Sequence, residues 1–249
     1  MTVHPQRSGS PAAKAVIGAV LLGLAVWVVM NSPVFAVRDF RVLGTDGILD
    51  GEILRIAAVE EGENLIMLPT DEVAARLEKH PWIEDAAVGR DLPATVVIRV
   101  LERSPAGWLE DPEGPVVVAG DGTVLARRQR TPEALPWVGT WPDPLAPGDM
   151  IDGPAEELRI SSAMSPWLLR RVATAELDDG DVILELRGGG SVLYGTPTEV
   201  EAKNRALAGM LEWAEGQGVE VGRVDVRIPS APSLEPAGGN APTAPIPVP

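Results

Sequence analysis

The sequence predicts an α+β protein in which a single N-terminal membrane-spanning helix is followed by two folded units. Three observations support this prediction: an uncharged apolar run near the N-terminus, a strand–helix–helix–strand–strand order over residues 38–103, and a later series of short strands. Those later strands end in one amphipathic helix and a last strand, so the second unit is predicted as a mixed or antiparallel β domain.

The apolar run covers residues 15–30 and contains neither a charge nor a proline. As a helix it would be ~24 Å long, which is short of the ~30 Å hydrocarbon core of a bilayer. Residues 34–37 are also apolar and extend the span, so we predict a transmembrane helix over residues 15–36. The side chains expected to anchor it in lipid include Ala15, Val20, Leu24, Trp27 and Met30.

The charges around this run predict its orientation. Arg7 and Lys14 precede it and no acidic residue occurs before Asp39, so residues 1–14 are expected to be a cytoplasmic tail and the rest extracytoplasmic. A signal peptide cleaved after Ala36 is the alternative, because Val34 and Ala36 fit the small-residue pattern of a cleavage site. A buried core helix is disfavoured by the uniform apolarity of the run.

Composition excludes some kinds of protein. The formal net charge is −15 and the chain has no cysteine. Disulfides and thiolate chemistry are therefore absent. Binding to nucleic acid needs a basic face, and the sequence shows none.

The first folded unit begins with a predicted strand at residues 38–44, where Phe40 and Val42 alternate with charged residues. A helix follows over residues 50–59, with Asp50 as its expected N-cap. Thr70 is the expected N-cap of a second helix.

That second helix is expected to stop before Pro81. Two runs rich in valine and isoleucine come next, at residues 82–90 and 95–103, joined by a connector that contains Pro93. This arrangement predicts a β-hairpin.

The second unit opens with a predicted hairpin over residues 116–128, because Asp121-Gly122 readily adopts the backbone angles of a tight turn. A helix is expected over residues 155–165. A further hairpin is expected over residues 181–196, with its turn in the glycines at 188–190.

The last helix has the clearest signals of the chain. Thr196, Pro197 and Glu199 fit an N-cap, a first-turn proline and a capping box. A half-buried strand at residues 223–228 follows, expected at a sheet edge. Residues 230–249 are rich in proline and are predicted to be a disordered tail.

Residues 35–108 resemble the POTRA domain of the bacterial division proteins FtsQ and DivIB. The resemblance lies in "GENLIML" at residues 62–68 and in "HPWIEDAAVGRDLPATVVIRVLERSPAGW" at residues 80–108. Positions that fit the family pattern are Phe35, Val37, Phe40, Val42, Gly44, Pro81, Trp82, Ala86, Val88, Arg90, Pro93, Thr95, Glu102, Arg103 and Pro105. It implies a POTRA domain over residues 37–106 and an FtsQ-type β domain over 107–229, where "LPWVGT" and "LYGTP" also look like the family.

The resemblance implies a non-catalytic, single-pass divisome protein of the cell membrane at the septum. Such a scaffold links early and late division proteins and supports septal cell-wall synthesis. The implied partners are FtsB/DivIC-like and FtsL-like proteins, with other division proteins meeting the POTRA domain.

The implied binding mode is addition of a partner segment to an edge strand of the second domain. The residues expected to carry it are Val224, Asp225, Val226, Arg227, Ile228 and Ser230. Arg227 would meet a carboxylate and Ser230 would form a hydrogen bond. The family often has an aromatic residue at the Ile228 position and glycine at the Ala231 position, and without the resemblance this segment would be an ordinary edge strand.

The residues offer little for catalysis. The histidines are His4 and His80, without metal-ligand spacing, and no nucleophile elbow occurs. We therefore predict no enzyme activity, no cofactor and no metal. One alternative is a wall hydrolase using scattered acidic residues or a glycan-binding module using Trp137 and Trp141. Another is an outer-membrane assembly protein, which would need repeated POTRA units.

Overall fold

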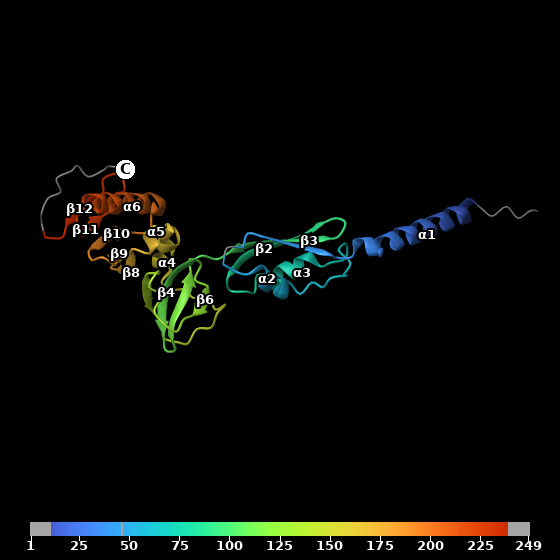
Figure 1. The fold of residues 1–249 in the computed structure, drawn as a ribbon, viewed down its shortest axis with the longest axis horizontal. Coiled ribbons are helices and arrows are strands. Elements are labelled where there is room, and N and C mark those ends of the chain that lie inside the picture. Colours follow the sequence, from blue (N-terminus) through green and yellow to red (C-terminus); the bar gives the residue numbers. More distant parts are fainter. Residues whose placement is uncertain (1–10, 46, 239–249) are drawn as a thin grey trace, which may run out of the picture. The chain divides into compact units, whose positions relative to one another are not determined.

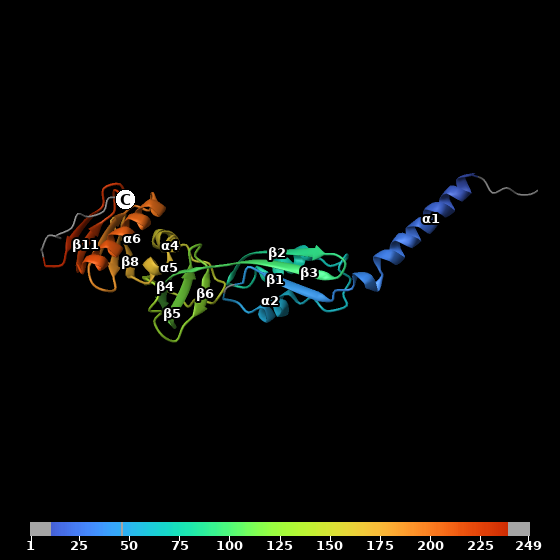
Figure 2. The same cartoon turned by 45° about the horizontal axis from the view of Figure 1, so that its top comes forward.

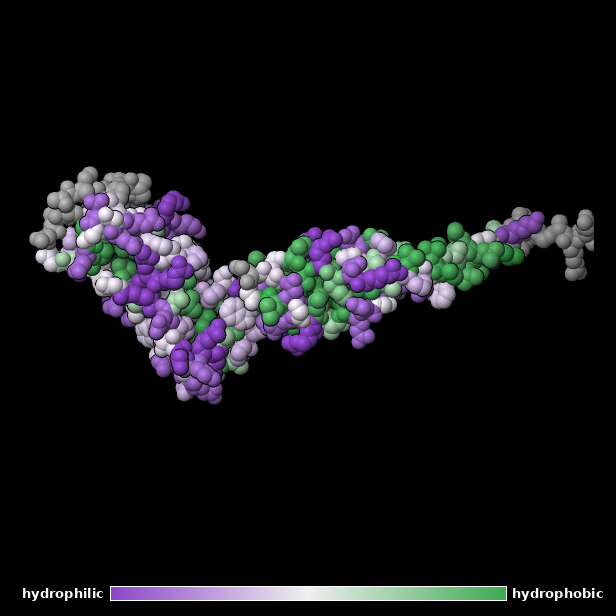
Figure 3. Space-filling view, in the orientation of Figure 1, coloured by the Kyte–Doolittle hydropathy of each residue, from purple (hydrophilic) through white to green (hydrophobic). Residues whose placement is uncertain are grey.

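The N-terminal apolar run forms the helix α1 (Pro11–Met30) in the computed structural model, which describes residues 11–45 and 47–238. The stretch Lys14–Phe35 is long and apolar enough to cross a membrane by length and composition, and none of it is buried. Figure 3 shows a largely hydrophobic surface along α1, with hydrophilic atoms near its N-terminal end. Most of the expected tail at residues 1–14, and residues 239–249 of the predicted disordered tail, lie outside the described residues.

Beyond α1 the chain divides into two units, each with its own sheet and core. Unit 1 contains the residues up to Lys79 together with Ile83–Glu102, and unit 2 contains His80–Trp82 and the residues from Arg103. Figure 1 labels their elements in chain order.

Unit 1 has the predicted strand–helix–helix–strand–strand order. Its sheet has the strand order β1-β3-β2, with β3 parallel to β1 and antiparallel to β2. Both helices, labelled in Figure 1, pack their apolar side chains against this sheet in one core, and the three strands are labelled in Figure 2. The elements are β1 (Asp39–Leu43), α2 (Asp50–Ala57), α3 (Thr70–Leu77), β2 (Ile83–Asp91) and β3 (Thr95–Glu102).

The core of unit 1 forms because the apolar stripes of both helices face β3. Ile53 and Leu77 have no exposed surface, and neither has Ile98 of β3. Burying each such side chain stabilises the fold by ~1.5–3 kcal/mol.

The predicted caps of these helices are wrong. Asp50 and Thr70 are the first helical residues, and the N-cap positions are Leu49 and Pro69, without a side-chain cap. The Asp50 carboxylate instead accepts a hydrogen bond from Thr45 Oγ1 at 3.0 Å, so it is not used to cap the helix.

The segment between α1 and β1 is built into unit 1. Leu65 N donates to Phe35 O at 2.8 Å, and Val37 N donates to Glu63 O at 2.8 Å. Val37 is only 1% exposed and belongs to the core. The chain on both sides of Ala36 is therefore part of the folded unit.

Unit 2 is built on a nine-stranded sheet with the order β12-β11-β10-β9-β8-β7-β4-β5-β6. The predicted hairpins are present as β5–β6 and β9–β10, whereas β4 was not predicted. The strands are β4 (Pro105–Asp111), β5 (Gly114–Ala119), β6 (Val124–Arg127), β7 (Trp137–Thr140), β8 (Val172–Asp178), β9 (Asp181–Leu186), β10 (Ser191–Gly195), β11 (Val221–Asp225) and β12 (Ser233–Pro236).

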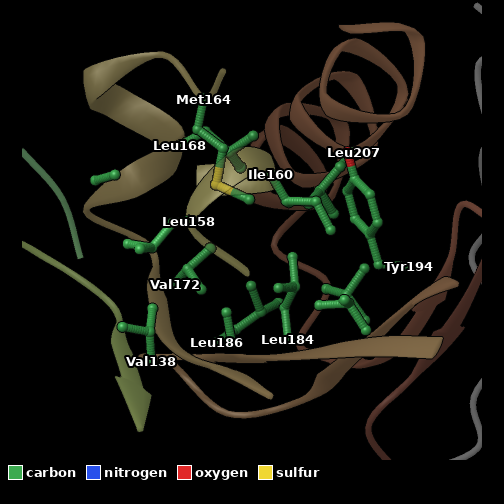
Figure 4. Close-up of a cluster of buried hydrophobic side chains, with 14 of the residues drawn as sticks. Val138, Leu158, Ile160, Met164, Leu168, Val172, Leu184, Leu186, Tyr194 and Leu207 are labelled. Carbon is green, nitrogen blue, oxygen red and sulfur yellow. The ribbon is translucent and has the colours of Figure 1, made fainter. Parts of the chain in front are cut away.

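Three helices pack against this sheet: α4 (Ala155–Ser162), α5 (Pro166–Leu169) and α6 (Val200–Gln217). Figure 4 shows Leu158, Ile160 and Leu207 from the helices meeting Leu184 and Tyr194 from the strands. This arrangement is the predicted β domain with a C-terminal helix and strand.

A buried polar network fixes α6 on β10. Lys203 is 2% exposed, and its Nζ donates to Tyr194 O at 3.1 Å and to Thr196 O at 2.8 Å. Tyr194 Oη donates to Asn204 Oδ1 at 3.0 Å. Burial lowers the pKa of Lys203 and raises that of Tyr194. These bonds hold the helix against the strand that pairs with β11.

The predicted start of α6 is wrong. The helix begins at Val200, because Glu199 has a φ of 52° in the left-handed region and cannot continue a helix backwards. Thr196 therefore does not cap it, and its hydroxyl lies 3.1 Å from that of Thr198. At the C-terminal end, Gly218 takes a left-handed φ of 65° just beyond the helix, as glycine commonly does there.

Candidate partner-binding edge

The segment predicted to bind a partner lies within the sheet. β11 pairs in parallel with β10 and antiparallel with β12, so both sides of β11 are occupied. The predicted open edge at Val224 is therefore wrong. The predicted disorder is also wrong at its start, because residues 233–236 form β12.

β12 is the end strand of the sheet, and no strand of the described residues pairs with its outer side. The opposite end differs. There Val124 of β6 donates its N–H to Asp149 O and accepts from Gly148 N, both at 2.8 Å. A loop thus satisfies the outer groups of Val124 in β6, whereas nothing comparable pairs with the outer side of β12 within residues 11–45 and 47–238.

β12 is short and held by a single large side chain. Leu234 is 6% exposed and packs into the core of unit 2, whereas Ser233 and Glu235 face solvent. Pro232 precedes the strand and Pro236 is its last residue, and neither can donate a backbone hydrogen bond. Short, proline-bounded edges resist uncontrolled pairing, so any added strand must match a narrow window.

Two of the predicted binding residues are core residues. Val224 and Val226 have no exposed surface, so their side chains cannot contact a partner. Asp225, between them, is half-buried on the other face of the strand. This follows from the alternation of side chains along a strand.

Arg227 is already paired inside unit 2. Its Nη2 lies 2.6 Å from Asp225 Oδ2, and its main-chain N donates to Asp225 Oδ1 at 3.0 Å. The Arg227 guanidinium holds the pKa of Asp225 below its ordinary value. Any partner carboxylate must therefore compete with Asp225 for this cation.

Gly195 makes room for Arg227. A Cβ atom built on Gly195 would lie 3.0 Å from Arg227 Cγ, and the residue has a φ of 74°. Both the space and the backbone angle favour glycine here, so the stem of Arg227 packs on the end of β10.

The remaining predicted residues, Ile228 and Ser230, are exposed. Ile228 is 64% exposed, and the turn after it closes with a bond from Ala231 N to Ile228 O at 3.0 Å. A depression of about 330 Å³ lies between this turn and β12. Its lining is Asp225, Arg227, Ile228, Ala231 and Ser233.

A second, polar depression of about 200 Å³ lies on the same face. Arg223 and Glu235 line it from neighbouring strands, with Arg223 Nη1 3.9 Å from Glu235 Oε2. The face beside β12 therefore carries mixed charge around one exposed apolar side chain, Ile228.

The predicted anchor side chains are all on α1. Val20 and Trp27 are each 63% exposed, Leu24 is 55% exposed and Met30 is 40% exposed. Ala15 is also exposed. Apolar side chains on every side of a helix, outside any core, are what a lipid-embedded helix needs.

The tryptophans that raised a glycan-binding alternative are half-buried. Trp141 packs against the main core of unit 2, and Trp137 lies in β7. Trp82 and Trp108 are partly buried and contact a second buried cluster. Among the described residues, no three His, Cys, Asp or Glu side chains are grouped so as to hold a metal ion.

Sequence reasoning missed β12, although a signal was present. Ser233, Leu234 and Glu235 alternate polar, apolar, polar, and Leu234 is the only leucine after residue 211. A single alternation between prolines is too short to separate a strand from an extended linker.

Comparison with known proteins identifies relatives of both units. The family model described as "POTRA domain, FtsQ-type" matches residues 35–103. A "Cell division protein FtsQ" of Mycobacterium leprae is 28% identical over 216 residues, which are 86% of this chain and 59% of that protein. The one of Mycolicibacterium smegmatis is 30% identical over 194 residues, which are 78% of this chain and 56% of that protein.

A third relative, the cell division protein FtsQ of Streptomyces bingchenggensis, is 27% identical over 88% of this chain and 83% of its own. The chain thus spans less than two thirds of the first two relatives. Among solved structures, the major extracytoplasmic domain of the division protein DivIB from Geobacillus stearothermophilus matches with a TM-score of 0.33 and 13% identity. That match covers 47% of this chain and 95% of that domain.

Proposed function

Because the chain belongs to the FtsQ/DivIB family of bacterial cell division proteins, we propose that it is a non-catalytic assembly protein of the divisome. α1 holds it in the cell membrane, and units 1 and 2 lie outside the cytoplasm at the septum. It links early and late division proteins and thereby supports septal wall synthesis.

The observation that carries the binding proposal is that β12 ends the sheet, with no described strand paired to its outer side. An extended partner segment adds to this edge, with main-chain hydrogen bonds giving affinity. β12 therefore replaces residues 224–230 as the strand that is augmented. Those residues lie on the inner side of β12, away from the added strand, and supply side chains next to it.

Side chains next to β12 supply the specificity. The depression of about 330 Å³ under Ile228 accepts an apolar partner side chain. Arg223 of β11 and Glu235 of β12 present opposite charges next to the added strand. Complementary charges on the partner segment would fix the register in which that segment pairs with β12. The partner proposed here is a segment of an FtsB/DivIC-like protein in complex with an FtsL-like protein. Unit 1 is the part of the chain proposed to bind other division proteins.

Co-purification with the ectodomains of FtsB-type and FtsL-type partners tests this proposal. A chain truncated after Ala231 lacks β12, and a chain truncated after Gly238 keeps it. The proposal expects the shorter chain to lose the partners and the longer one to retain them. Equal retention by both chains would refute binding at β12.

The truncation after Ala231 uncovers β11, so its folding has to be measured separately. Thermal unfolding followed by circular dichroism serves this purpose. The full chain with Ile228→Asp provides a second test, because Ile228 is exposed and its replacement leaves the core intact. Loss of the partners with an unchanged melting temperature supports the proposal, and full binding contradicts it.

A further inference from the structure

Three large apolar side chains are exposed where α1 joins unit 1. Val34 is 54% exposed, Met67 is 71% exposed and Leu92 is 60% exposed. They come from three separate segments: the turn η1 (Pro33–Phe35), the loop before α3, and the connector between β2 and β3. We call these three residues the juxtamembrane patch.

Backbone hydrogen bonds bring the three segments together. The loop before α3 is bonded to the segment after α1, since Leu65 N donates to Phe35 O at 2.8 Å. The β2–β3 connector is bonded to it as well, because Ala94 O accepts from Arg38 N at 2.9 Å. The patch is therefore fixed by the fold of unit 1 and does not depend on a flexible loop.

Asn64 connects the loop to the end of α1. Its Nδ2 donates to Met30 O at 2.7 Å, satisfying one of the carbonyls that a helix leaves unpaired at its C-terminus. Its Oδ1 accepts from Ile66 N at 3.0 Å and from Met67 N at 3.3 Å. One side-chain amide therefore links the backbone at Ile66 and Met67 to the last turn of α1.

Arg90 holds the same loop from the other side. Its Nε donates to Leu65 O at 2.9 Å, and its Nη2 donates to Leu68 O. The loop around Met67 is therefore held at both ends. A side chain with 71% exposure on so constrained a loop contributes little to the core of unit 1.

Single exposed apolar residues are common on soluble proteins, and unit 1 has others, such as Leu49 and Leu101. The patch differs in its position. The uncharged part of α1 after Lys14 is ~24 Å long, about 6 Å short of a ~30 Å hydrocarbon core. Apolar side chains just beyond Met30 would occupy the remaining part of the hydrocarbon core that α1 does not reach.

We propose that the juxtamembrane patch lies in the interfacial layer of the outer leaflet, so that unit 1 rests on the lipid surface next to its own anchor. The contact is apolar. Glu60, Glu61 and Glu63 lie in the loop beside it and outnumber the nearby cation Arg38, whose Nη2 donates to Pro33 O at 3.2 Å, so anionic lipid offers no net attraction. This inference rests on the proposed membrane anchoring by α1 and is independent of partner binding at β12.

The absence of cysteine allows a direct test. The full chain is reconstituted in phosphatidylcholine vesicles with single substitutions Met67→Cys or Leu92→Cys, each carrying a nitroxide spin label. Collision with oxygen, which concentrates in lipid, and with a water-soluble nickel chelate reports the depth of each label. Leu101→Cys is the matched aqueous control, since Leu101 is 54% exposed and lies ~20 Å along β3 from the β2–β3 connector that holds Leu92. Leu22→Cys, at 68% exposure in α1, is the lipid control.

We expect labels at Met67 and Leu92 to collide with the nickel chelate several-fold less often than the label at Leu101. Replacing half of the phosphatidylcholine by phosphatidylglycerol should not change this. If Leu22 is in lipid while Met67 and Leu92 are as accessible as Leu101, the inference is overturned and the anchor stands. If the label at Leu22 is itself accessible to the nickel chelate, the proposed membrane anchoring by α1 is refuted, and the inference about the patch is refuted with it.

Discussion

Leu234 of β12 lies directly opposite Val224 of β11 in the antiparallel ladder, and both side chains are buried. This pair attaches the last strand of the sheet to the strand that sequence analysis had placed at the edge. Because β12 has no other large apolar side chain, its attachment depends on Leu234.

Leu234→Ala should release β12. Truncating a buried leucine costs ~2–5 kcal/mol, so we expect a lower melting temperature of unit 2 and a loss of FtsB/FtsL-type partners in co-purification. Leu177→Ala is the control, since Leu177 is 47% exposed in β8 and lies away from β12. If Leu234→Ala binds the partners as well as the control does, β12 is not part of the interface.

Ile228→Ser should weaken partner binding without destabilising the fold. Burying an isoleucine in an interface is worth ~1.5–3 kcal/mol, so the Kd should rise ~10- to 100-fold. Leu177→Ser is the control, because Leu177 is 47% exposed in β8, away from β12. Titration calorimetry with the partner ectodomains measures both variants, and equal Kd values would remove Ile228 from the interface.

Much of the fold was predictable because strong patterns coincide with long elements. The runs at residues 82–90 and 95–103 form β2 and β3, and the three glycines at 188–190 lie in the turn between β9 and β10. The incorrect predictions lie where the conformation of a single residue sets the boundary of an element. Glu199 takes a left-handed backbone angle that no sequence rule assigns to glutamate, so α6 begins later than its capping signals indicate.

The candidate site was predictable only in part, for a related reason. Alternation located β11 and its buried valines, but which strand ends a sheet depends on tertiary pairing. Leu234 pairs across from Val224 only because the turn at Ile228–Ala231 reverses the chain. The pairing of Arg227 with Asp225 likewise depends on side-chain geometry beyond the reach of the sequence.

Asp111→Asn should reduce the decrease in the free energy of unfolding that occurs at acid pH. Asp111 is buried, and its carboxylate accepts from Arg127 at 2.6 and 2.7 Å and from Leu145 N at 2.8 Å. The bond from Arg127 holds the pKa of Asp111 well below its ordinary value. A carboxyl with a lowered pKa stabilises the fold above its ordinary pKa, and that stability is lost as the pH falls below about 4.

Urea unfolding at several pH values measures this effect. The wild-type free energy of unfolding should fall steeply below pH 4, while the Asp111→Asn chain starts lower and falls less. Glu113→Gln is the control, because Glu113 contacts the same Arg127 at 3.4 Å but is exposed. Parallel profiles for the wild type and Asp111→Asn would contradict the assignment.

Lys203→Met should destabilise unit 2 although it replaces a charge by an apolar side chain. The variant leaves Tyr194 O and Thr196 O without their donor, and an unpaired buried carbonyl costs ~1–3 kcal/mol. Lys79→Met is the control at an exposed lysine. A melting temperature at or above wild type for Lys203→Met would show that the network does not stabilise α6 on β10.

Hydrogen–deuterium exchange of the full chain, with and without the FtsB/FtsL-type ectodomains, tests strand addition at β12 most directly. We predict that exchange slows at backbone amides within Ser233–Glu235 when the partners bind. The Val124 amide of β6, already bonded to Asp149 O, should not change. Partner binding that leaves the β12 amides at their free rates, with protection elsewhere, would contradict the account.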